Sequence, residues 1–193
     1  EEYYEGNRRV VQLLNNSVIH LIPTINPWGF HQVTRNRYNI NNIDLNRDYP
    51  DHYKYPNKTL SQVQQETRNI MNYVTTYDEL VLAANFHEGA RIISYPYDGA
   101  AHNTSGVSGT PNESPDNYLY FCKKYSQYMN PKLIGSNSYP SNQTFGSMNG
   151  ADWYTIFGGM QDWEYVYHDI MSITIETSLV KNRSADTLYN LRK

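Results

Sequence analysis

Polar side chains follow three apolar segments of the chain, at points where reactive groups could gather. Each apolar segment has the length and composition of a buried strand, and the pairs of segment and polar group are residues 18–24 with Asn26-Pro27-Trp28-Gly29, residues 80–86 with His87, and residues 170–175 with Glu176. Enzymes built on mainly parallel sheets bind their ligands beyond the carboxyl ends of the strands. We therefore expect these polar residues to share one site.

His87 and Glu176 have the side chains for metal binding and proton transfer. A histidine at a strand end can ligate a metal or can be a hydrogen-bonded structural residue, and His87 alone does not decide between the two roles. Glu176 closes an apolar strand, where loss of solvation would raise its pKa and suit it to general acid and base work. The alternative is that Glu176 points to solvent at the edge of the sheet.

The segment from Arg37 to Arg47 concentrates hydrogen-bond donors in one loop and ends in Asp44-Leu45-Asn46-Arg47. The planar guanidinium group of arginine can make two parallel hydrogen bonds to a carboxylate. The segment could therefore bind an acidic group of a substrate. It could equally be a solvated loop with local ion pairs.

The elements that would position these residues alternate along the chain. Residues 61–73 have a helical pattern with Val63, Ile70, Met71 and Val74 on one face and a capping box from Ser61 to Gln64, and residues 115–129 predict a second helix with a buried Cys122. Strands separated by helices indicate an α/β fold in which helices cover both faces of a mainly parallel or mixed, twisted sheet. The 193 residues are enough for one domain.

Composition excludes several functional classes. The net charge of -3 indicates no footprint for nucleic acid or for an anionic membrane, and no apolar run approaches the ~20 residues of a membrane span. A single cysteine excludes a disulfide within the chain. Six Asn-x-Ser/Thr sequons favour a secreted or lumenal glycoprotein; they begin at Asn15, Asn57, Asn103, Asn112, Asn142 and Asn182.

The order of the short motifs resembles the zinc carboxypeptidase family, and within it the regulatory branch of carboxypeptidases D, E and N. The matching pieces are Asn26-Pro27-Trp28-Gly29, Arg37, Asn39, Asp44-Leu45-Asn46-Arg47, His87-x-Gly89, Tyr95-Pro96-Tyr97-Asp98, Asn149-Gly150-Ala151-x-Trp153-Tyr154, Gly158-Gly159-Met160-Gln161-Asp162 and Ile173-Thr174-Ile175-Glu176. Each piece is weakly specific alone. Together they cover essentially the whole chain in the right order.

The resemblance implies a role for each of these residues in removing the last residue of a peptide or protein. His87 would be one of three ligands of a single Zn²⁺ ion, Glu176 the general base and acid, and Arg37 the group that stabilises the oxyanion. The remaining roles are binding of the substrate's terminal carboxylate by Asn46 and Arg47, closure over the substrate by Tyr154, recognition of a basic last side chain by Asp98 and Gln161, and orientation of a zinc-binding histidine by Asp44.

The family pattern also has departures here. No H-x-x-E motif, the source of the other two zinc ligands, occurs in the chain. We expect that motif upstream of residue 1, so that residues 1–193 form a partial peptidase domain without its N-terminal part and last helix. Such a chain would by itself be inactive. The resemblance further predicts a cis peptide bond between Pro96 and Tyr97.

Two other functions fit the same fold. One is a non-catalytic pseudocarboxypeptidase that keeps the carboxylate-binding arginines without a metal, although retention of the full set of catalytic residues argues against it. The other is an amidohydrolase of the aspartoacylase type, which has a similar Asp-Leu-Asn-Arg segment. Trp153-Tyr154 and the segment from Gly158 to Asp162 favour the carboxypeptidase over that amidohydrolase.

Overall fold

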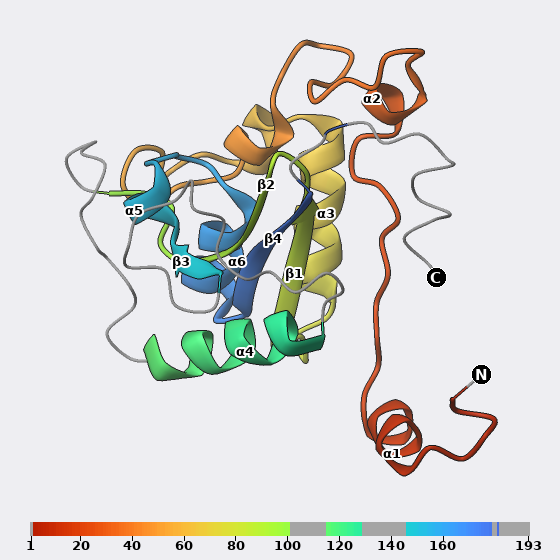
Figure 1. Cartoon of the computed structure of the whole chain (residues 1–193). Coiled ribbons are helices and arrows are strands. Elements are labelled where there is room, and N and C mark those ends of the chain that lie inside the picture. The colour runs from red at the N-terminus through yellow and green to blue at the C-terminus, as the bar shows by residue number, and fades with distance from the viewer. Residues whose placement is uncertain (1, 101–114, 129–145, 179–180, 182–193) are drawn as a thin grey trace.

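The computed structural model describes residues 2–100, 115–128, 146–178 and 181 of the chain (Figure 1). In chain order the elements are α1 (Arg8–Asn16), α2 (Pro27–His31), the short 3₁₀ helices η1 (Leu45–Arg47) and η2 (Leu60–Gln62), α3 (Gln65–Thr76), β1 (Leu82–His87), β2 (Ala90–Tyr95), α4 (Pro115–Tyr128), β3 (Ser147–Asn149), α5 (Gly150–Trp153), α6 (Met160–His168) and β4 (Met171–Ser178). The predicted position 129, and the sequons at 103, 112, 142 and 182, lie outside the described residues.

The four strands of the described part form one mixed sheet in the order β1-β4-β2-β3. β1 pairs with β4 and β2 pairs with β3 in parallel, whereas β2 and β4 are antiparallel. The register of β1 and β4 places His87 directly beside Glu176. The sheet confirms the predicted α/β class, and it brings together two residues that lie 89 positions apart in the sequence.

Alternation along β4 distributes its side chains to two faces. Ile173 and Ile175 pack with Tyr118 and Cys122 of α4 in one hydrophobic cluster. On the other face, the Ser172 hydroxyl donates to Glu164 of α6. Helices therefore cover both faces of the sheet, as the sequence predicts, and Cys122 is the buried small hydrophobe that was expected.

α3 packs through the predicted face but begins later than predicted. Ile70, Met71 and Val74 are buried together with Val63 in a second core cluster. The helix starts at Gln65, because the capping box belongs to Thr59 and Gln62 and caps the separate 3₁₀ turn η2. The backbone N–H of Thr59 donates to the Gln62 side chain over 2.8 Å. The prediction of a capping box from Ser61 to Gln64 was wrong.

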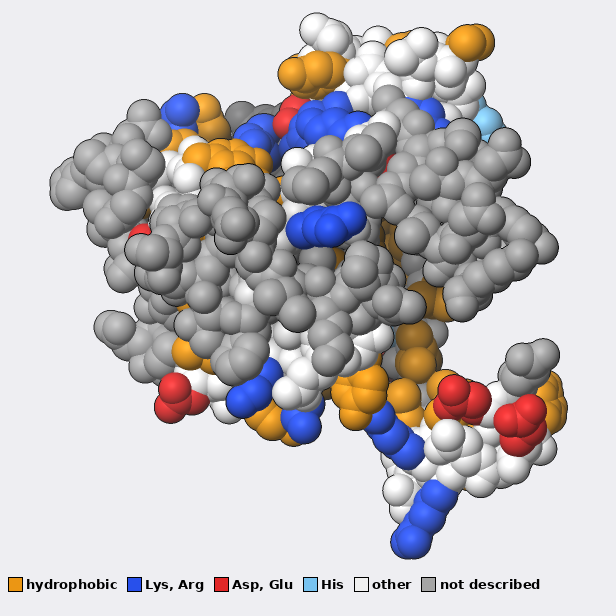
Figure 2. Space-filling view, in the orientation of Figure 1, with side chains coloured by type: hydrophobic (Ala, Val, Ile, Leu, Met, Phe, Trp, Pro, Cys, Tyr) orange, Lys and Arg blue, Asp and Glu red, His pale blue; other side chains and the backbone are white. Residues whose placement is uncertain are grey.

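The prediction of a buried strand at residues 18–24 was also wrong. The segment runs extended between α1 and the rest of the molecule without pairing to the sheet, and its apolar side chains are exposed, Leu21 to 84% (Figures 1 and 2). The segment contacts α3 and its end, where the His20 ring packs against the rings of Tyr73 and Tyr77. Apolar composition predicts that a segment is buried, but it does not identify the element against which the segment packs.

Two further expectations concern single features. The peptide bond between Pro96 and Tyr97 is cis, as predicted. Among the described residues, no helix combines the length and the apolar character needed to cross a bilayer.

Candidate active site

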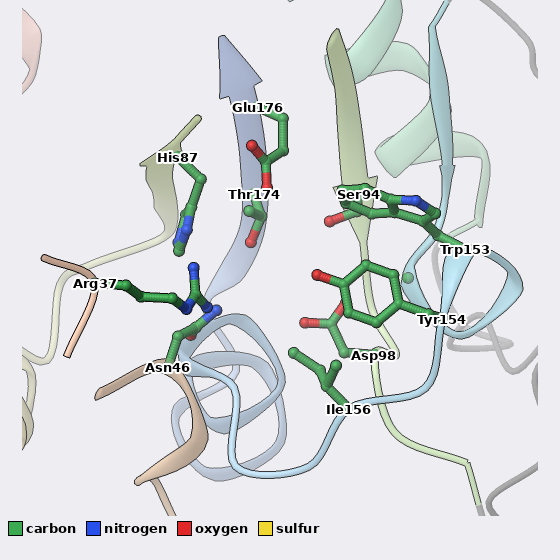
Figure 3. Close-up of a pocket in the computed structure, with 11 residues that line it drawn as sticks. Arg37, Asn46, His87, Ser94, Asp98, Trp153, Tyr154, Ile156, Thr174 and Glu176 are labelled. Atoms are coloured by element: carbon green, nitrogen blue, oxygen red, sulfur yellow. The ribbon is translucent and has the colours of Figure 1, made fainter. Parts of the chain in front are cut away.

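A pocket opens at the carboxyl ends of β1 and β4, where the sequence predicts the site. Its lining comes from segments far apart in the chain and consists of Arg37, Asn46, His87, Ser94, Asp98, Gly150, Trp153, Tyr154, Ile156, Thr174 and Glu176. Arg37, Asn46 and His87 approach from one side, and Asp98, Trp153 and Tyr154 face them from the other (Figure 3). Six of the nine residues predicted for the site thus line one pocket.

His87 and Glu176 occupy neighbouring positions on parallel strands at the edge of this pocket. Burial, and then the charge of Arg37, lower the pKa of His87 to about 4, so the ring is neutral at pH 7 and has a lone pair available for a metal. Burial raises the pKa of Glu176, and Arg37 opposes that increase. Glu176 is buried, and its Oε2 atom has no hydrogen-bond partner in the described part of the chain.

Arg37 and Asn46 are held in place by Asp44 and by α6. Arg37 Nε donates to Asp44 Oδ2 over 2.7 Å, and the other oxygen of Asp44 accepts from the backbone N–H of Asn46 at the start of η1. Asn46 Oδ1 in turn accepts from Met160 N over 2.9 Å. The NH₂ group of Asn46 is consequently the part of this side chain that can donate to a ligand in the pocket.

Arg47 does not line the pocket. A 3₁₀ helix turns by about 120° per residue, so consecutive side chains of η1 point in different directions. Arg47 Nη1 donates to the backbone carbonyl of Asn46 over 2.7 Å and lines a neighbouring hollow beside Asp48 and Lys58. Its charge nevertheless acts on the pocket, because it lowers the pKa of Asp98.

Asp98 lines the pocket, and Gln161 contacts it without lining the pocket itself. Gln161 Nε2 donates to Asp98 Oδ1 over 2.7 Å, and both side chains are buried. Burial, and then the negative charge of Asp162, raise the pKa of Asp98 above its ordinary value. Gly150 packs closely against this carboxylate: a Cβ atom at that position would lie 1.8 Å from Asp98 Oδ1, so a larger residue does not fit there.

Tyr154 stands at the mouth of the pocket with 44% of its surface exposed, next to the ring of Trp153. Five lining residues were assigned no role from the sequence, namely Ser94, Gly150, Trp153, Ile156 and Thr174, although Gly150, Trp153 and Thr174 belong to the family motifs. Ser94 and Thr174 are buried polar residues that directly follow an isoleucine in β2 and β4, and that change from apolar to polar is the signal that could have identified them. Ile156 carries no comparable signal.

The described residues do not complete a catalytic zinc site. Such a site has three protein ligands, and His87 belongs to no group of three His, Cys, Asp or Glu side chains with converging ligand atoms in the described ranges. A group of that kind occurs elsewhere, where ligand atoms of Asp51, His52 and Asp162 lie within 4.8 Å of one another. The carboxylates of Asp51 and Asp162 already accept hydrogen bonds from backbone N–H groups.

The pocket defines a class of chemistry. A buried carboxylate with a raised pKa can move a proton, an arginine beside it can stabilise negative charge on a reacting oxygen, and an amide can bind a carboxylate. This set suits hydrolysis of an amide bond near the end of a peptide. Comparison with known proteins agrees, since the model of the zinc carboxypeptidase family matches residues 1–191. The chain belongs to that family.

Individual relatives support the regulatory branch that the sequence resembles. The chain is 33% identical to the human carboxypeptidase N catalytic chain, over 94% of this chain and 46% of the relative. It is 34% identical to mouse carboxypeptidase M over 92% of this chain and 41% of the relative. Identity to human carboxypeptidase D is also 34%, over 89% of this chain and 13% of the relative. The chain thus spans less than half the length of these relatives.

Proposed function

We propose that the protein is a zinc-dependent exopeptidase that removes single residues from the C-terminal ends of peptides or proteins. The observation that supports this proposal is the convergence of Arg37, Asn46, His87, Tyr154 and Glu176 on one pocket. Membership of the zinc carboxypeptidase family supports it independently.

Binding of the free terminal carboxylate falls to Asn46, whose NH₂ group is directed by the hydrogen bond from Met160 N to its oxygen. Arg47 contributes positive charge from just outside the pocket. Tyr154, half exposed at the mouth, closes over the bound residue. A peptide amide, which has no carboxylate, should therefore be a poor substrate.

Proton transfer falls to Glu176. Its carboxylate accepts a proton from the attacking water and passes it to the nitrogen of the leaving residue, and a raised pKa brings it nearer to the operating pH. Arg37 donates to the carbonyl oxygen on which negative charge develops, and Asp44 fixes the direction of that donor. Zinc, when bound, supplies Lewis-acid chemistry, with His87 as one ligand.

The preferred last residue is lysine or arginine. Asp98 lines the pocket as a buried carboxylate without an ion pair within 4.0 Å among the described residues. Desolvation of such a carboxylate is unfavourable until a cation neutralises it. A basic side chain of the substrate would provide that cation, and Gln161 would orient the carboxylate that receives it.

A peptide panel tests the proposal with the full gene product. The peptides share one sequence and differ in the last residue (Arg, Lys, Leu or Phe), and each has a C-terminally amidated counterpart as its control. We expect release of Arg and Lys from the free acids and no release from the amides. Equal or faster release of Leu and Phe would overturn the basic preference, and cleavage of the amides would overturn the exopeptidase activity.

The absence of an H-x-x-E motif from these 193 residues favours a second candidate, a binding module without catalysis. For the 193-residue chain by itself we propose weak zinc binding and no peptidase activity. Calorimetry with Zn²⁺ on the full gene product separates the candidates. Tight binding of one ion supports the enzyme, and failure to bind zinc together with retained binding of peptide C-termini supports the binding module.

We also propose a secreted or secretory-pathway location. Asn15 and Asn57 are exposed, so an oligosaccharide could be attached to either without a change in the fold. Mass spectrometry before and after glycosidase treatment of the protein from its native source tests this expectation, and an unmodified mass would count against it.

A further inference from the structure

The backbone that carries Asp98 is held from behind by a second carboxylate, that of Asp162. The N–H of Asp98 donates to both oxygens of Asp162 over 2.9 and 3.0 Å, and the N–H of Gly99 donates to Oδ2 over 2.9 Å. Asp162 has only 2% of its surface exposed and does not line the pocket. It therefore acts on the pocket through Asp98.

Asp162 and its neighbour Gln161 hold Asp98 at different points. Both belong to the first turn of α6, where successive side chains point about 100° apart. Gln161 contacts the carboxylate of Asp98, whereas Asp162 contacts the backbone of the same residue. One helical turn therefore determines both the place of Asp98 and the direction of its carboxylate.

The rest of this loop is attached in the same manner. The carbonyl groups of Pro96, Tyr97 and Asp98 accept hydrogen bonds from Asn149 Nδ2, Ala151 N and Ile156 N, over 2.9, 2.9 and 3.0 Å. These contacts hold the carbonyl groups, and Asp162 holds the N–H groups. Replacement of Asp162 would leave two buried N–H donors without their acceptor, and the chain would move to find another.

We propose that Asp162 is a positioning residue for the side chain of the substrate's last residue. By fixing the N–H groups of Asp98 and Gly99, it sets the Asp98 carboxylate at the place where a lysine ammonium or an arginine guanidinium group binds. This inference rests on the proposed preference for basic residues. A displacement of about 1 Å in such a site can cost roughly a hundredfold in rate.

The test compares four variants of the full gene product with the unmodified protein. Asp98→Asn removes the carboxylate that meets the substrate, and Asp162→Asn removes one acceptor oxygen behind it. Asp162→Glu keeps the negative charge but displaces the oxygens by one methylene group. Asp78→Asn, at an exposed aspartate after α3, is the matched control. The readouts are kcat/KM for peptides ending in Arg and in Leu, and calorimetric binding of Nα-acetyl-arginine and Nα-acetyl-norleucine.

We expect Asp98→Asn, Asp162→Asn and Asp162→Glu each to lower the Arg-to-Leu ratio, and the acetyl-arginine to acetyl-norleucine affinity ratio, by about tenfold or more. The values for Leu and norleucine should change little, and Asp78→Asn should change nothing. A purely structural role for Asp162 would lower both substrates equally and leave the ratios unchanged. That result, together with a reduced ratio in Asp98→Asn, would overturn the positioning role of Asp162 and leave the proposed basic preference intact.

Two other results are equally decisive. Unchanged ratios in Asp98→Asn would overturn the basic preference and the inference together. Retained selectivity in Asp162→Glu would assign the effect to the charge of Asp162 and would overturn positioning.

If the Asp162 variants do not fold, amide hydrogen exchange of the unmodified protein provides the test. We expect the N–H groups of Asp98 and Gly99 to be protected before any ligand is added, and exchange as fast as in an exposed loop would contradict the inference.

Discussion

Replacement of Gly150 by alanine should displace Asp98 and destabilise the protein. Gly150 is buried at the start of α5, and the Cβ atom of an alanine there would lie 1.8 Å from Asp98 Oδ1, 2.9 Å from Cγ and 3.0 Å from Cα. Ordinary contact begins at 3.4 Å, so the carboxylate oxygen must retreat by about 1.6 Å. The backbone of Asp98 must also move, because its Cα atom is too close.

The cost of this displacement has two sources. Overpacking of a buried site costs about 1–3 kcal/mol, and loss of the hydrogen bond from Gln161 to the Asp98 carboxylate costs about 1.5–3 kcal/mol. Partial relaxation makes the sum smaller than the two values together, and we expect about 3 kcal/mol. In a protein of this size that corresponds to a fall in Tm of about 6–12 °C.

The same substitution at a neighbouring glycine provides the control. A Cβ atom at Gly159 would lie 3.2 Å from Asp98 Oδ2, so a shift of a few tenths of an ångström relieves it. Differential scanning calorimetry should therefore show a large fall in Tm for Gly150→Ala and a fall of at most about 2 °C for Gly159→Ala. Equal Tm values for the two variants would refute the steric reasoning.

Three further predictions concern pH, zinc and catalysis. Burial raises the pKa of Glu164 to about 7, so the folded state holds this proton more tightly than the unfolded state. The free energy of unfolding should therefore fall by about 3 kcal/mol as the pH rises from 4.5 to 7. Glu164→Gln should reduce this pH dependence in urea titrations, and an unchanged dependence would contradict the prediction. His87→Ala in the full gene product should weaken zinc binding by more than the ~10–100-fold caused by loss of a residue that only hydrogen-bonds to a metal ligand. His31→Ala, at an exposed histidine, is the control and should not weaken it. Equal zinc affinities of the two variants by calorimetry would exclude His87 as a ligand. Arg37→Lys should lower kcat by about a hundredfold with little change in KM, and a change confined to KM would assign Arg37 to binding.

Part of the site could be predicted because two of its residues, His87 and Glu176, lie where apolar strand patterns end. The patterns of β1 and β4 are visible in the sequence, and parallel pairing brings their carboxyl ends together without further information. His87 and Glu176 were therefore predicted from two local patterns to share one site. The family motifs added Arg37 and Asp98, whose place in the pocket no local pattern indicates.

What could not be predicted depends on distant partners. The apolar residues 18–24 indicate a need for cover, but exposure in the structure shows that the described residues do not supply it. Arg47 was expected to bind the substrate's terminal carboxylate together with Asn46. The turn geometry of η1 points the two side chains in different directions. Asp162 accepts from backbone groups 63 and 64 residues away, an interaction with no local sequence signal.

The long-range hydrogen bonds that hold the pocket together also determine when it can form during folding. Met160 bonds to Asn46 across 114 positions, and Gly158 bonds to Asp51 across 107. Closing such long loops is entropically costly, so contacts of this kind follow the local helices and hairpins. A chain still emerging from the ribosome can have α3 and β1 but has no binding pocket until residues 146–178 have been made. The protein thus acquires this recognition surface only after the segment that carries β3, α5, α6 and β4 has been made.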